Sequence, residues 1–202
     1  MNPNRKRENN SEIVKRQILT AAQDILIEDG FDKLSIRKIA ERIQYSPGLI
    51  YHYFQNKNEI VRELVLDGTK KIGRAISSVT QNTDLPQETL KQMFLSYVKY
   101  ALSIPESIRA MVINDDGGGY IRIMGKGISE TNPNIAFLVR WINIGIEKGI
   151  FRNLDPELAA QTYWITAFGL VSRLIIEKEI PDEQREKIIG QTADILIHGM
   201  LK

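Results

Sequence analysis

The chain contains no cysteine and only two histidines, His52 and His198, among its 202 residues. The lack of thiols excludes disulfide frameworks, thiolate nucleophiles and cysteine-bound metal sites, and two histidines are too few for a multi-histidine metal centre. Neither the G-x-S-x-G pattern of serine hydrolases nor the G-x-x-x-x-G-K-[ST] pattern of phosphate-binding loops occurs in the chain. The sequence therefore predicts a protein that has no metal, no cofactor and no catalytic site.

Long apolar runs are also lacking. No segment approaches the roughly 18 consecutive apolar residues that a membrane helix needs, and the polar, basic first ten residues are unlike a secretory signal. We therefore expect a cytoplasmic protein without a membrane partner. The composition that is present, 43% hydrophobic and 26% charged, suits one large folded domain or two small ones. The net charge of +2 arises within residues 1–60 and says little about partners.

Apolar residues recur with helical spacing along nearly the whole chain, and no segment shows the alternation of a strand. A first helix is expected to end at Asp29-Gly30, because glycine readily adopts the left-handed conformation that terminates helices. Proline, asparagine and glycine breaks then separate further helices, expected over residues 36–43, 47–54, 56–79, 84–103, 134–148, 156–178 and from 181 onward. The sequence predicts an all-α fold.

Two of these helices are short and closely spaced, at 36–43 and 47–54. Ser35 and Ser46 are suited to be their N-caps, and Pro47 is favoured at a first helical position. This layout is typical of a helix-turn-helix, in which the second helix enters the major groove of DNA. The side chains that it would present are Ser46, Pro47, Gly48, Leu49, Tyr51 and His52.

This region closely resembles the helix-turn-helix of the tetracycline-repressor (TetR) family of bacterial transcription regulators. The residues that match the family pattern in type and spacing are Ile39-Ala40, Ser46, Gly48, Tyr51, Phe54 and Lys57. One departure is Gln44, which stands where the family usually has glycine in the turn. If Gln44 adopts a positive φ, the turn is strained by about 1 kcal/mol.

The resemblance implies two domains and a set of roles. A DNA-binding domain would occupy residues 10–60, with its motif at about 36–55, and an effector-binding and dimerisation domain would occupy 61–202. Phosphate contacts are expected from Ser35, Tyr51 and Lys57. Contacts at or near base edges are expected from Arg37, Tyr45, Ser46, Pro47, Gly48, Leu49 and His52. Phosphate contacts supply affinity, whereas base contacts supply discrimination.

The last two predicted helices are apolar on wide faces, more than a domain of this size readily buries within itself. Pairing them with a second copy across a two-fold axis would give a four-helix interface, as in the family. The residues predicted at this homodimer interface are Ile165, Gly169, Ser172, Ile189, Ala193, Leu196 and Met200. The alternative is a monomer in which these helices form the centre of the bundle.

Bulky aromatic and methionine residues are concentrated in the middle of the chain and suit an apolar pocket for a small effector. They are Met93, Phe94, Tyr97, Tyr100, Met111, Phe137, Trp141, Trp164 and Phe168. They suit an ordinary core equally well, and a pocket is implied by the resemblance alone. Arg109, Arg122 and Arg140 could pair with an acidic effector, although such arginines more often lie on the surface.

These observations predict a homodimeric, ligand-responsive regulator that binds double-stranded DNA. We expect a repressor that leaves a palindromic operator when a small apolar or aromatic effector binds. One alternative is a helix-turn-helix protein that acts through a protein partner and has no specific operator. A further alternative, an enzyme, has no catalytic residue pattern to support it.

Overall fold

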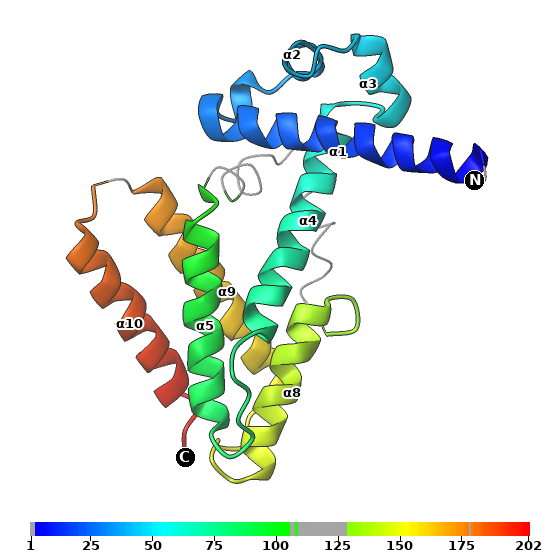
Figure 1. Cartoon of the computed structure of the whole chain (residues 1–202). Coiled ribbons are helices and arrows are strands. Elements are labelled where there is room, and N and C mark those ends of the chain that lie inside the picture. Colours follow the sequence, from blue (N-terminus) through cyan, green and yellow to red (C-terminus); the bar gives the residue numbers. More distant parts are fainter. Residues whose placement is uncertain (1–2, 106–107, 109–128, 178) are drawn as a thin grey trace. The chain divides into compact units, whose positions relative to one another are not determined.

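The computed structural model describes residues 3–105, 108, 129–177 and 179–202, and within them the regular secondary structure is helical (Figure 1). The expected all-α fold is confirmed. The described chain forms two compact units, one made of residues 3–68 with Ile108 and the other of residues 69–105 and 129–202. The helix α4 (Lys57–Ser77) contributes its first turns to one unit and its remainder to the other.

The N-terminal unit is built from α1 (Pro3–Asp29), a 3-10 turn η1 (Phe31–Lys33), α2 (Ile36–Arg42), α3 (Pro47–Tyr53) and the start of α4. In Figure 1, α2 and α3 lie at an angle to one another beside the long α1. α1 packs against η1 and α2, and α2 packs against α3. The core that holds them together consists of Ile18, Ala22, Ile25, Leu26, Leu34, Ile39, Ala40, Ile50, Phe54 and Ile60.

Local sequence signals determine where these helices begin and end. Gly30, at a φ of 80°, follows α1 and gives the left-handed residue that stops it. The Ser35 and Ser46 hydroxyls accept the backbone N–H groups of Lys38 and Leu49, at 3.2 and 3.3 Å, and so cap α2 and α3. Each predicted N-cap is therefore confirmed by a hydrogen bond.

The second unit contains α5 (Pro86–Leu102), α8 (Pro133–Glu147), α9 (Pro156–Ile176) and α10 (Asp182–His198). α5 packs against α8, α9 and α10, and α8 packs against α9. Aromatic rings fill the space between them: Phe94 meets Tyr163 edge-on at 5.8 Å, and Tyr97 lies 5.2 Å from Trp164. The buried Tyr163 hydroxyl donates to the Leu90 carbonyl at 2.7 Å, and burial raises the pKa of this phenol well above its usual value.

A glycine and a phenylalanine fix the end of α8. Gly145 is buried in α8, and a Cβ placed on it would lie 2.1 Å from the Phe151 ring, which is itself buried. Only glycine allows the ring to lie so close to the helix backbone. The chain end is held nearby, since the Arg152 N–H donates to the Met200 carbonyl at 3.0 Å and Lys202 N–H to the Ile150 carbonyl at 3.2 Å.

Candidate nucleic-acid interface and effector cavity

The helix-turn-helix exposes the side chains that the sequence predicted to touch DNA. Eight of the ten are exposed and two, Leu49 and Lys57, are half-buried. Ile50 and Phe54, on the opposite side of the same short segment, are fully buried. The residues from Ser46 to Gln55 include no carboxylate, so the exposed face of α3 carries no charge that repels phosphate. The N-terminal unit thus holds α3 by its apolar side and leaves its polar side open.

Several of these side chains already have partners within the unit. The Arg37 guanidinium lies 3.2 Å from the Glu41 carboxylate, and the Tyr45 hydroxyl donates to Gln17 Oε1 at 3.4 Å. The Lys57 ammonium lies 4.1 Å from the centre of the Phe31 ring, which is a cation–π contact. These contacts orient the side chains on the exposed face without burying them.

The turn between α2 and α3 has the strained geometry that the sequence indicated. Gln44 has a φ of 57°, in the left-handed region that favours glycine. The turn is closed by the Tyr45 N–H, which donates to the Ala40 carbonyl at 2.9 Å. The expected strain at this departure from the family pattern is therefore present in the fold.

Two ion pairs join the end of α1 to α2. The Lys38 ammonium lies 2.7 Å from the Asp29 carboxylate, and Arg42 lies 2.5 Å from Glu28. The hydrogen bond from Lys38 lowers the pKa of Asp29, and that from Arg42 lowers the pKa of Glu28. Both pairs reach the solvent, so they fix the orientation of α2 more than they stabilise the unit.

Large apolar side chains are exposed along one side of α9, and α10 exposes a further one. Leu158, Ile165 and Ile176 of α9 are 61, 67 and 65% exposed, and Ile195 of α10 is 66% exposed. These α9 residues, with Thr162 and Gly169 between them, recur at helical spacing on one side of the helix. We call Leu158, Thr162, Ile165, Gly169, Ile176 and Ile195 the apolar strip. Large apolar residues gathered on one exposed face are characteristic of protein–protein contact.

The predicted dimer residues differ in how far the protomer exposes them. Ile165 and Gly169 lie in the apolar strip, and Ser172 and Leu196 are half-buried. Ile189, Ala193 and Met200 are buried in the protomer itself. The structure thus brings part of the predicted set to the surface and uses the other part in the core of the second unit.

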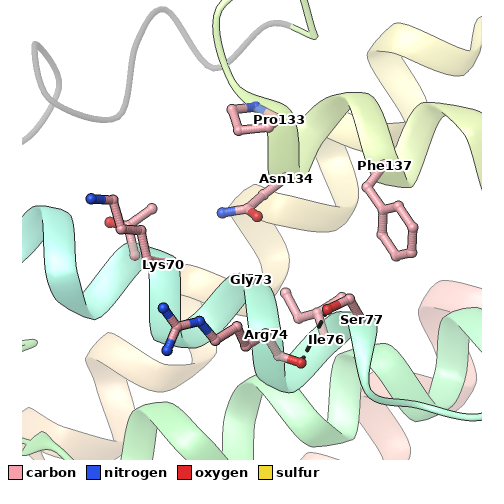
Figure 2. A pocket seen from close by; sticks show the side chains of 9 residues that line it. Lys70, Gly73, Arg74, Ile76, Ser77, Pro133, Asn134 and Phe137 are labelled. Atoms are coloured by element: carbon pink, nitrogen blue, oxygen red, sulfur yellow. Dashed lines mark hydrogen bonds between the residues drawn. The ribbon is translucent and has the colours of Figure 1, made fainter.

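A cavity of about 410 Å³ lies between the second half of α4 and the first turns of α8 (Figure 2). It is entirely within the second unit. Its lining consists of Thr69, Lys70, Gly73, Arg74, Ile76, Ser77, Pro133, Asn134 and Phe137. Figure 2 shows the Asn134 side chain directed toward Gly73 and the Phe137 ring on the same side of α8.

Of the eight predicted effector residues that the structure describes, Phe137 alone lines this cavity. Met93, Phe94, Tyr97 and Trp141 are buried core residues, and Tyr100, Trp164 and Phe168 are half-buried. Met111 lies outside the described residues, as do Arg109 and Arg122. Arg140 is exposed and does not line the cavity.

The sequence reasoning did not single out the polar lining of this cavity, Lys70, Arg74, Ser77 and Asn134. The sequence predicted a pocket lined by aromatic residues, which this fold uses mainly for packing. The sequence feature that could have identified this lining is the run of cations on α4, where Lys70, Lys71 and Arg74 occur within five residues without a carboxylate.

In the described part of the chain, no three histidine, aspartate or glutamate side chains gather in a way that could hold a metal ion. The helices in that part are too short or too polar to cross a membrane.

Comparisons with known proteins agree with the geometry of the N-terminal unit. Residues 18–64 match the family model described as "Bacterial regulatory proteins, tetR family". The transcriptional regulator BetI of Escherichia coli is 30% identical over 190 residues, which cover 93% of this chain and 80% of BetI. The regulator UidR of Escherichia coli K12 is 28% identical over 200 residues, covering 93% of this chain and 92% of UidR.

The fold agrees as well. The structure of the fatty acid degradation regulator FadR from Bacillus halodurans superposes with a TM-score of 0.71 at 21% identity, covering 91% of this chain and 94% of that one. The family model spans the end of α1, α2, α3 and the start of α4, where the residues predicted to face DNA lie. The chain therefore belongs to the TetR family of transcriptional regulators, helix-turn-helix DNA-binding proteins and not enzymes.

Proposed function

We propose that this protein is an operator-specific repressor that works as a homodimer and leaves a palindromic DNA site when a small effector binds. The observation that carries the proposal is the surface of the helix-turn-helix and the start of α4, where every predicted DNA-facing residue is exposed or half-buried above a buried apolar core. A recognition helix held in this way can enter a major groove as a rigid element.

Three residues of this surface supply affinity in the proposal. The hydroxyls of Ser35 and Tyr51 and the ammonium of Lys57 contact backbone phosphates. The Ser35 oxygen already accepts the Lys38 N–H, which leaves the hydroxyl proton to donate to a phosphate. Tyr51 is 57% exposed, so its hydroxyl reaches solvent without rearrangement.

Base discrimination is assigned to Arg37, Tyr45, Ser46, Pro47, Gly48, Leu49 and His52. The small residues at the start of α3 allow the helix backbone to approach the base edges. Few long polar side chains follow them, so apolar contact and DNA shape contribute much of the specificity.

The dimer is proposed to form through the apolar strip on α9 and α10. Four exposed isoleucine and leucine side chains favour a partner surface of the same kind, which a second copy supplies by symmetry. Ser172, also in the predicted interface, has a buried hydroxyl without a hydrogen-bond partner in the described protomer. A dimer would place two recognition helices about 34–36 Å apart, one turn of DNA.

The effector is proposed to bind the cavity between α4 and α8. α4 belongs to both compact units, so a ligand that favours one position of α4 can change the affinity for DNA. The change cannot exceed the difference in effector affinity between the DNA-bound and free conformations.

The test is selection of bound duplexes from random DNA, followed by measurement of the stoichiometry of the best complex. We expect an enriched palindrome bound by two protomers. Tyr51→Phe should then weaken binding to the palindrome and to scrambled duplexes by a similar factor, because phosphates carry no sequence information. Failure of the folded protein to enrich any sequence at low salt would refute operator-specific regulation and favour action through a protein partner.

A further inference from the structure

The cavity between α4 and α8 combines positive charge with an apolar wall. We propose that it binds an organic anion, in which a carboxylate or sulfonate is attached to an apolar or aromatic body, and that this anion is the effector. That the anion is the effector rests on the proposed function, whereas binding of the anion concerns the cavity alone.

Two cations of the lining lie one helical turn apart. Lys70 and Arg74 are four residues apart on α4, so their side chains share one side of the helix. Like charges at this spacing repel one another, and an anion between them removes that repulsion. Within the part of the chain that the structure describes, no carboxylate pairs with either side chain, and the lining itself contains no acidic residue.

The α8 end of the cavity adds to the same potential. Pro133 and Asn134 begin α8 and line the cavity, so the positive end of the helix dipole faces it. The Asn134 side chain reaches toward α4 because residue 73 is glycine: a Cβ there would lie 2.9 Å from Asn134 Oδ1. Rotation of this amide presents its NH₂ group to an anion, whereas the Ser77 hydroxyl donates to the Arg74 carbonyl at 3.2 Å (Figure 2).

The rest of the lining suits an apolar body. Ile76 and Phe137 contribute a buried methyl group and a half-buried ring, close to the cations in the same cavity. A volume of about 410 Å³ lies within the range of small-molecule pockets. A purely apolar ligand would leave the cations without a partner, and a simple inorganic anion would leave the ring uncovered.

Two fluorescent probes that differ in one group test the charge requirement. Anilinonaphthalene sulfonate carries an anion on an aromatic body, and phenylnaphthylamine is its uncharged counterpart. Titrated into the intact 202-residue chain, the sulfonate is expected to bind about tenfold more tightly than the neutral amine. The Lys70→Gln/Arg74→Gln variant should lose this preference, because both positive charges are removed. Both side chains are exposed, so their replacement leaves the core intact.

Two further variants test whether the preference for the anionic probe arises in this cavity. Arg140→Gln removes an exposed arginine of α8 that does not line the cavity, so it should keep the preference. Gly73→Leu should fill the cavity and weaken both probes. Thermal unfolding confirms that each variant is folded. The anion site is refuted if the wild-type protein binds neither probe, binds both equally, or keeps its preference after Lys70 and Arg74 are replaced.

Release of the selected operator separates this inference from the proposed function. If the sulfonate binds with the expected preference and lowers operator affinity, both are supported. If it binds with that preference but operator affinity does not change, the anion site stands and its role as the effector site is refuted.

Discussion

The exposed faces of α3 and α9 differ in the chemistry that they offer to a partner. α3 exposes Ser46, Gly48, Tyr51 and His52, which are small or polar, whereas α9 exposes leucine and isoleucine. Both helices are anchored by buried residues on their other side: Ile50 holds α3, and Ala167 and Val171 hold α9. Both helices therefore bury apolar residues on one side, and they differ in the chemistry of the side that they expose.

The two units also differ in how their helices are held. In the N-terminal unit, serine caps and the ion pairs of Lys38 and Arg42 orient helices of seven residues. In the second unit, helices of 15 to 21 residues are held by large buried aromatic rings and by the approach of Phe151 to Gly145. Loss of the Lys38 and Arg42 pairs should therefore affect only the N-terminal unit, whereas crowding at Gly145 should affect only the second.

The largest expected effect comes from placing charge on the apolar strip. Ile165→Glu combined with Ile195→Glu should convert the proposed dimer to a folded monomer, because both side chains are exposed in the protomer. Losing the second half-site contact should weaken operator binding by about a hundredfold or more. Sedimentation velocity and operator titration measure the two effects.

The control is Leu85→Glu, which changes an exposed leucine before α5 that lies outside the strip. It should leave both the dimer and the operator affinity intact. A double variant that stays dimeric would rule out the strip as the interface.

The next largest effect should be Gly145→Ala. Its Cβ would overlap the buried Phe151 ring, and forced repacking of this kind costs about 1–3 kcal/mol. Urea unfolding measures the loss. Gly190→Ala is the matched control, because a Cβ there meets no atom within 4 Å and should instead stabilise α10 by about 0.5–1 kcal/mol. Equal stability of the two variants would contradict the packing role of Gly145.

A smaller effect, of opposite sign, is expected at the turn of the helix-turn-helix. Gln44→Gly should stabilise the N-terminal unit by about 0.5–1 kcal/mol, because glycine adopts a φ of 57° without strain. Thermal unfolding measures the gain. Gln44→Ala, which removes the side chain but keeps the Cβ, should show none; a gain in that variant would mean that the side chain, and not the backbone, is unfavourable.

The smallest effect is the response of the N-terminal unit to acid. Folding lowers the pKa of Asp29 and of Glu28, so both carboxylates stabilise the fold above their unfolded pKa values, and this contribution is lost as the pH falls through the folded values. We expect a modest loss of stability below about pH 5. Glu28→Gln/Asp29→Asn should flatten the pH profile of unfolding, and an unchanged slope would contradict the contribution of these pairs.

The helix-turn-helix could be predicted because each of its signals is local. Serine caps, Pro47, Gly30 and the spacing from Ile39 to Lys57 all act within a few residues, and the structure shows each helix where they place it. Even the strain at Gln44 follows from one residue in one turn.

The apolar faces of α9 and α10 could be predicted only in part. Their composition indicates helices with more than one apolar side, but it does not say which side meets the protomer's own core. The rotation of each helix decides this, and it buries Ile189 and Ala193 while exposing Ile165 and Ile195; Met200, which follows α10, is buried as well.

By itself, the sequence determined the family and the helical fold, because both depend on short-range patterns that survive in the folded state; the residues that it assigns to DNA contact remain a prediction. The tertiary structure alone decided where a cavity opens and what charge it carries. Its lining combines residues 69–77 with residues 133–137, and only the packing of α4 near α8 brings Lys70 and Arg74 to the same space as Asn134 and Phe137. Contacts between segments so far apart in the chain depend on how the whole core packs, and a local sequence pattern does not predict that packing.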